Sequence, residues 1–217
     1  MSQTIHPSSI MLVEPHYLPT LEFFCAAFPF PEIRLERHAH YVKQGWRNRT
    51  IVNTANGISI LTVPLARKGN RVPLGEVTID NSTNWARTHW RTIESAYKNS
   101  PFFEHYETAL RNLLMRRQPD LFELNRDILS VFLSWLGWNT TITETRFFEQ
   151  NPAATDFRDV LRAKIPATQR AFYNPVPYYQ VFGNTFAGNL SLIDLIFCCG
   201  PSSGEILKRS RADGRMI

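Results

Sequence analysis

The chain has 217 residues, of which 43% are hydrophobic and 20% charged, a composition typical of a folded globular protein. The net charge is only +5 and the cationic residues are dispersed without a nucleic-acid motif, so no specific nucleic-acid partner is expected. Three cysteines without a CxxC pair exclude a disulfide framework and a zinc ribbon. We expect a cytoplasmic protein without a membrane span, because residues 1–10 lack signal-peptide features and no apolar stretch is long enough to cross a bilayer.

The first eighty residues are predicted to be rich in strands. Pro29 and Pro31 end the one helix predicted there, and Asn56-Gly57 is a strong hairpin signal between two β-branched segments. The predicted elements are a strand at 10–13, a helix at 21–27, and strands at 33–36, 50–53, 58–64 and 75–79.

The rest of the chain is predicted to be mainly helical, because apolar residues recur there at intervals of three and four. The predicted elements are helices at 84–99, 102–117 and 121–136, a strand at 140–145, a short helix at 156–164 and a helix at 190–199. These patterns predict an α/β fold, with α+β as the alternative: a strand-rich N-terminal half and a helical C-terminal half packed on one sheet. We expect a single domain over residues 1–207, followed by a basic, frayed tail at 208–217.

Several segments together resemble one family, in order from about residue 10 to about residue 208. They are Glu14-Pro15-His16-Tyr17-Leu18-Pro19, residues 41–49 (YVKQGWRNR), residues 61–64 (LTVP), Trp85, His89-Trp90, residues 101–103 (PFF), Tyr179-Gln180, residues 190–196 (LSLIDLI) and Gly200-Pro201. This set resembles the WbqC-like protein family. The resemblance implies a bacterial protein encoded among genes for O-antigen and related surface polysaccharides, with an uncharacterised reaction. Glu14 stands where that family usually carries glutamine.

The first candidate for the site is a polar cluster at the end of the first predicted strand. Glu14, His16 and Tyr17 follow the first strand, and the carboxyl ends of strands form the ligand crevice of open α/β sheets. Glu14 and His16 are candidate catalytic residues that handle a proton, and Tyr17 is a candidate substrate ligand. The alternative is that Glu14 only forms a structural hydrogen bond where the strand ends.

The second cluster is cationic. Lys43, Asn48 and Arg49 are candidate ligands for the phosphates of a nucleotide sugar or an acyl donor, because arginine binds oxyanions bidentately and lysine adds a mobile charge. The alternative is a solvated basic face. The sequence contains no glycine-rich phosphate-binding motif, so no dinucleotide cofactor is expected.

The histidines give a third set of candidates. His38 and His40 lie two residues apart and could ligate one metal ion if the segment is extended, but no metal motif accompanies them and we predict no metal. His40 and His89 are retained as candidate catalytic residues. Trp85 lies one helical turn from His89 and is a candidate for stacking on a substrate, with core packing as the alternative.

The last candidates lie near the C-terminus. Tyr179, Gln180 and Asp194 are candidate substrate ligands. Ser191 and Asp194 also have the spacing of a capping box, and this structural interpretation is the favoured one.

The resemblance, together with the cationic motif, implies an enzyme of surface-polysaccharide biosynthesis that transfers an acyl or aminoacyl group to a nucleotide-linked amino sugar. The main alternative is a non-catalytic protein that binds nucleotides or carbohydrates, or a scaffolding protein of the same pathway. A metal-dependent hydrolase is a third possibility. The sequence defines neither a cofactor nor an oligomeric state.

Overall fold

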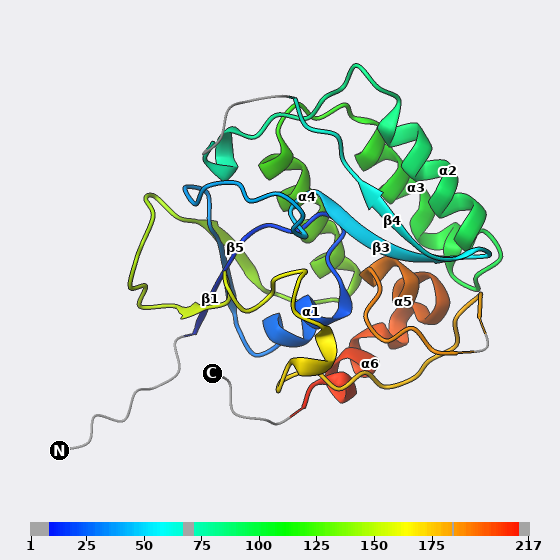
Figure 1. The fold of residues 1–217 in the computed structure, drawn as a ribbon. Helices are drawn as coiled ribbons and strands as arrows, with labels where there is room; N and C mark the ends of the chain where they lie inside the picture. The colour runs from blue at the N-terminus through cyan, green and yellow to red at the C-terminus, as the bar shows by residue number, and fades with distance from the viewer. Residues whose placement is uncertain (1–8, 67–71, 184, 213–217) are drawn as a thin grey trace.

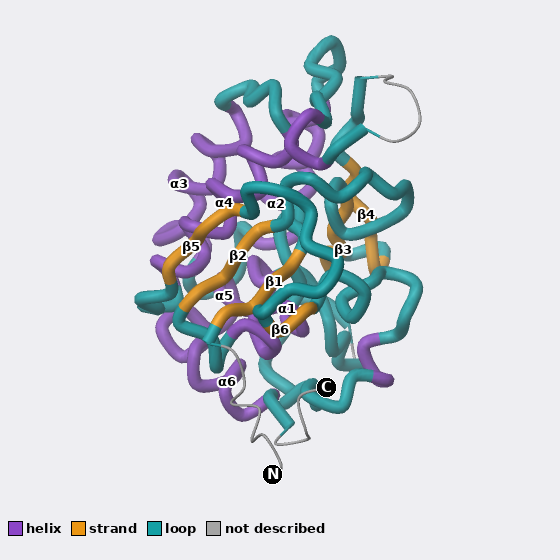
Figure 2. Tube along the Cα trace, turned by 90° about the vertical axis from the view of Figure 1, so that its left-hand side faces the viewer, coloured by secondary structure: helices purple, strands orange, loops and turns teal. Residues whose placement is uncertain are grey.

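A parallel sheet of four strands forms the centre of the molecule (Figure 2). The computed structural model describes residues 9–66, 72–183 and 185–212. The strand order is β5-β2-β1-β6, with β1 Ile10–Val13, β2 Glu32–Leu35, β5 Thr141–Glu144 and β6 Thr155–Asp156. Val13 pairs with Leu35, and Leu35 with Glu144, so the carboxyl ends of β1, β2 and β5 lie at the same edge. Three of the four residues of β1 are buried, as expected for an inner strand of a parallel sheet.

Helix α1, Leu21–Ala27, connects β1 to β2. All seven of its residues are buried, including the acidic Glu22. A short helix without an exposed face is stabilised by packing on all sides rather than by helix propensity. A carboxylate in such a helix therefore needs a buried partner.

The hairpin stands apart from the sheet as a separate pair of strands. Strands β3, Arg49–Thr54, and β4, Gly57–Thr62, pair in the antiparallel direction around the Asn56-Gly57 turn. In Figure 1 the hairpin lies between the α2–α3 helices and α5.

The remaining helices pack around these two sheets (Figure 1). They are α2 Trp85–Tyr97, α3 Phe103–Met115, α4 Leu121–Trp135, α5 Leu192–Cys199 and α6 Ser203–Ser210. Each of α2, α3 and α4 buries residues spaced by three and four positions, which is the pattern that predicted them. No helix in the described part of the chain has both the length and the apolar character needed to cross a membrane.

The α/β class is confirmed, but the division into halves is less strict than the sequence suggests. Strands β5 and β6 come from the C-terminal half and join the same sheet as β1 and β2. The chain leaves this sheet after β2, forms the hairpin and three helices, and returns as β5.

Two local predictions are wrong. Residues 75–79, predicted as a strand, begin in a 3-10 helix at Leu74–Glu76 and then form only isolated bridges, because no continuous partner strand lies beside them. The segment 156–164, predicted as a helix, begins as β6, because the open edge of β1 pairs with it. The Asp156 carboxylate then accepts a hydrogen bond from the Arg158 amide at 2.9 Å, which favours a turn over a helix.

The predicted tail begins too early. Helix α6 continues to Ser210, which is buried, and Arg211 forms an antiparallel bridge with Tyr173. Lys208 and Arg209 belong to the last turn of this helix, where cations are favourable for the helix dipole. Residues 213–217 lie outside the described residues.

Candidate functional site

A cavity of about 180 Å³ lies where the chain leaves β1. Three separate segments form its walls: the end of β1, the loop before β3, and the irregular segment after β6. Its lining residues are Glu14, His16, Val42, Lys43, Gln44, Gly45, Trp46, Arg47, Leu161, Arg162, Ala163 and Lys164. The cavity therefore occupies the edge of the sheet at which ligands bind in open α/β folds.

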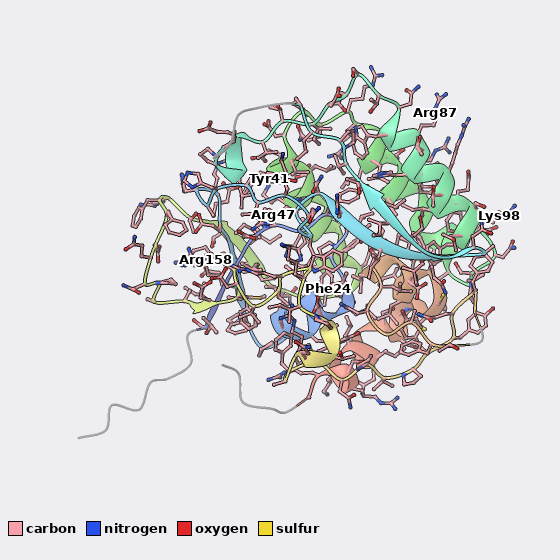
Figure 3. All side chains as sticks on the ribbon, in the orientation of Figure 1. Phe24, Tyr41, Arg47, Arg87, Lys98 and Arg158 are labelled. Carbon is pink, nitrogen blue, oxygen red and sulfur yellow. The ribbon has the colours of Figure 1, made fainter. Side chains whose placement is uncertain are left out.

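An ion pair between Glu14 and Arg47 forms part of the cavity wall. The Arg47 Nη2 atom contacts the Glu14 carboxylate, and the two side chains are only 10% and 11% exposed. Burial raises the pKa of Glu14, and the charge and hydrogen bond of Arg47 act in the opposite direction. Figure 3 shows Arg47 in the interior of the molecule, whereas Arg87 and Lys98 extend outward from the α2 region.

His16 lies beside this pair as a neutral imidazole. The imidazole ring is buried and packs against the Phe23 ring, with the two centroids 5.2 Å apart. The pKa of His16 is lowered to about 3. Burial is the main cause, and the positive charges of Arg47 and Arg170 add to it. The buried Nδ1 atom has no hydrogen-bond partner within the described part of the chain, so no protein group satisfies it there.

The backbone around Arg47 is held from two sides. The Arg47 carbonyl accepts a hydrogen bond from Asn125 of α4 at 2.7 Å, and the Trp46 carbonyl accepts one from the Tyr17 amide at 2.9 Å. Gly45 makes room for the side chain, since a Cβ atom there would lie 2.6 Å from Arg47 Nη1. The surrounding residues therefore hold the Arg47 side chain in a fixed position.

A second buried ion pair supports the far wall of the cavity. Arg170 donates from Nε to the Glu22 carboxylate at 3.1 Å, with side chains 5% and 2% exposed. Its Nη2 atom donates to the carbonyls of Arg162 at 3.0 Å and Ile165 at 3.3 Å. The pair therefore connects helix α1 to the segment that carries Arg162 and Lys164.

Tyr17, His89 and Trp85 form a different, buried cluster. The Tyr17 hydroxyl lies 2.9 Å from Nδ1 of His89, and the Trp85 indole packs on the same imidazole with centroids 5.3 Å apart. Trp85 donates to Asn81 at 3.1 Å. Burial lowers the pKa of His89 to about 4. The structure thus places these three candidates among packed rings, outside the residues that line the cavity.

Three more candidates of the first half also lie outside the cavity lining, whereas Lys43 belongs to it. Asn48 is buried and bonds Tyr41 and the Val63 carbonyl, each at 2.9 Å. Arg49 begins β3, and neither it nor His40, which is exposed and bridges to Pro73, lines the cavity. Among the described residues, no three His, Cys, Asp or Glu side chains are grouped so that they could hold a metal ion.

Asp194 forms a buried network with two residues of the preceding loop. Its carboxylate accepts hydrogen bonds from Tyr178 at 2.6 Å and from Gln180 at 2.9 Å. Tyr179, in contrast, is 63% exposed. The predicted capping box is wrong: Ser191 is the N-cap residue of α5, but its side chain makes no capping hydrogen bond. Asp194 instead pairs with Tyr178 and Gln180, which the chain brings back over the start of α5.

Three charged residues of the cavity did not emerge as candidates from the sequence. Arg47 stood among the cationic residues of the 41–49 segment without being chosen, and Arg162 and Lys164 fell in a predicted helix. An acidic residue inside an apolar helix, such as Glu22, is a usable signal for a buried partner. No sequence pattern identifies that partner as Arg170, because the two residues are brought together only by the tertiary fold.

The two neutral buried histidines predict a loss of stability in acid. Unfolded histidine binds a proton near pH 6.5, whereas folded His16 and His89 do so near pH 3 and pH 4. Their stabilising contribution is therefore present above pH 6.5 and is lost progressively as the pH falls below it. Urea unfolding between pH 7 and pH 4 should show a flatter pH dependence in His16→Leu than in wild type. His105→Asn on the exposed side of α3 is the control, and an unchanged slope in His16→Leu would contradict the expectation.

Comparisons with known proteins agree with the sequence resemblance. The model of the WbqC-like protein family matches residues 14–161, so the match begins at Glu14 and ends at Leu161 in the wall of the cavity. An uncharacterized protein of Mycobacterium tuberculosis, Rv1507c, is 25% identical over 227 aligned residues that cover 93% of this chain and 98% of the relative. No solved structure matches.

Proposed function

Because the chain belongs to the WbqC-like protein family, we propose that it is an enzyme of bacterial surface-polysaccharide biosynthesis that acylates an amino sugar carried on a nucleotide. The pairing of Glu14 with Arg47 beside the unpartnered His16 nitrogen is the observation that supports it most. A buried carboxylate at a sheet edge whose pKa is raised by burial is a better proton acceptor than an exposed one.

The size of the cavity suggests how a large substrate would bind. A space of about 180 Å³ accommodates the reacting amine and a short acyl group, so the nucleotide would lie outside the cavity. Lys43, Arg162 and Lys164 line the cavity and are exposed, so they are the cations we assign to the phosphates. This assignment keeps Lys43 from the sequence analysis and replaces Arg49.

The proposed reaction joins an amine to an acyl group from an activated donor, such as a thioester. The amine nitrogen bonds to the acyl carbon, the carbon–sulfur bond breaks, and the thiolate leaves with its electron pair. The proton of the attacking amine passes to the Glu14 carboxylate. His16 is neutral, so its Nδ1 atom can take part in one hydrogen bond, as donor or as acceptor according to the tautomer.

Ligand-induced stabilisation tests this proposal. A nucleotide-linked amino sugar at 100 times its Kd should stabilise the protein by about 2.7 kcal/mol and raise Tm by roughly 5–11 °C. The shift should disappear in Lys43→Ala/Lys164→Ala. The matched control is Arg87→Ala/Lys98→Ala, which removes the same charge from the exposed surface of the α2 region and should keep the shift.

Other outcomes separate the alternatives. A shift followed by no product with any acyl donor would favour a non-catalytic binding protein. No shift with nucleotide sugars, acyl-coenzyme A compounds or amino acids would contradict the proposal and favour a scaffolding role.

A further inference from the structure

The guanidinium of Arg47 is only partly satisfied within the protein. Its Nη2 atom contacts Glu14 and its Nη1 atom donates to the Val42 carbonyl at 3.2 Å, but its buried Nε atom has no hydrogen-bond partner among the described residues. His16 Nδ1, in the wall of the same cavity, is also buried and unpartnered. Buried polar atoms are rarely left without partners, so these two atoms at one cavity offer polar contacts to a bound ligand.

The charge of the cavity indicates what kind of ligand that is. The lining contains four cations, Lys43, Arg47, Arg162 and Lys164, and the single carboxylate Glu14. The charge of Arg162 is partly neutralised by an ion pair with Asp159, which does not line the cavity. The excess of positive charge favours an anion, and a guanidinium with a free Nε–H binds carboxylate or phosphoryl oxygens bidentately.

We propose that Glu14 is an internal counter-ion which a small anionic group of the substrate displaces from Arg47, and that Glu14 takes up a proton when this happens. The proposal rests on the proposed function in that it concerns the same cavity. It adds that substrate binding itself prepares the base. Glu14 gains the proton affinity to deprotonate the attacking amine only after the anion has replaced the Glu14 carboxylate on Arg47.

The groups around Glu14 explain why the proton would go there. Once an anion neutralises Arg47, the remaining charges facing Glu14 are the exposed Lys43, Arg162 and Lys164, with Asp159 opposing them. His16 stays neutral, and Arg170 is engaged by Glu22. Burial already raises the pKa of Glu14 against the attraction of Arg47, so removing that attraction raises it further. When a simple anion binds, the proton that forms the O–H bond comes from solvent. When the amine substrate binds, it is the proton that the substrate ammonium loses, so proton uptake by Glu14 and deprotonation of the amine are the same step.

Calorimetry with acetate and sulfate on the free protein tests this inference, because neither anion titrates near pH 7. Acetate reports a carboxylate ligand and sulfate a phosphoryl ligand. Titrations at pH 7 in buffers of different ionisation enthalpy should show uptake of up to one proton per anion bound. The affinity should weaken as the pH rises, by at most tenfold per pH unit.

Two variants give the proposal its sharpest test. Glu14→Gln should bind the anion about tenfold more tightly, without proton uptake, because the competing carboxylate is gone. Lys43→Ala should bind more weakly but keep the uptake. Anion binding by wild type without proton uptake, weaker binding by Glu14→Gln, or no binding of either anion would each overturn the inference.

These results are independent of the proposed function. Proton-coupled anion binding without any response to nucleotide sugars would leave the anion site standing and contradict the transferase. Acyl transfer without proton uptake on anion binding would support the transferase and contradict the displacement of Glu14 from Arg47.

Discussion

Glu14→Gln is expected to reduce acyl transfer by a factor of about 10²–10⁴, the usual contribution of a positioned general base. Glutamine has the size of glutamate and can still contact Arg47, but it cannot accept the proton of the attacking amine. The measurement is kcat with a nucleotide-linked amino sugar and a thioester donor. Thermal unfolding of the variant shows whether the fold is retained.

The pH dependence of the reaction identifies the group responsible. The base must be ionised, so kcat/KM should fall as the pH drops through the pKa of Glu14, at a pH above the ordinary value of 4.5 because burial raises that pKa. This acidic limb should be absent from the residual activity of Glu14→Gln. An unchanged limb in the variant would assign the base to another residue.

Glu36→Gln is the matched control. Glu36 is also a buried carboxylate paired with an arginine, Arg158, at 3.0 Å, but it lies outside the cavity lining. Its substitution should lower stability, because Glu36 also accepts hydrogen bonds from the His38 and Ala39 amides, and it should leave kcat close to wild type. Equal losses of turnover in the two variants would mean that Glu14 acts only through the fold.

Glu22→Ala is expected to have the largest effect on stability. Removing one partner of a buried ion pair leaves an uncompensated charge, here the guanidinium of Arg170, at a cost of about 3–5 kcal/mol. For a chain of this length that corresponds to a fall in Tm of roughly 6–20 °C. Chemical denaturation of the variant measures the free energy of unfolding directly.

Two further variants test the cause of this loss. Glu22→Leu/Arg170→Met removes both charges and should recover much of the stability, because no buried charge is left unpaired. Asp159→Ala breaks an exposed pair, with side chains 59% and 80% exposed, and should change stability by less than about 1 kcal/mol. A double variant as unstable as Glu22→Ala would show that the pair matters for reasons other than its charge.

The loss of Glu22 should also affect anion binding in the cavity. Arg170 fixes the carbonyls of Arg162 and Ile165, so releasing it from Glu22 loosens the wall that carries Arg162 and Lys164. Anion affinity should therefore fall in Glu22→Ala, even at temperatures where the variant is folded.

Periodic and local features were predictable from the sequence. The long amphipathic helices follow from apolar residues at intervals of three and four, and the hairpin follows from Asn56-Gly57 between β-branched segments. The position of Glu14 and His16 at the end of β1 is also a local property, because a buried strand that meets a proline must end there. The family resemblance rests on linear motifs and was likewise readable from the chain.

What only the tertiary structure decided is which charged residues meet. The partners Glu14 and Arg47, and Glu22 and Arg170, lie on segments that the sheet and helix α1 bring together. Periodicity reports which face of an element is buried, but not which residue lies opposite it. For the same reason Ser191 and Asp194, spaced as a capping box, make other contacts, and the edge of β1 recruits Thr155–Asp156 as a strand. The cavity is made of such non-local contacts, and their energies depend on burial, which exists only in the folded chain.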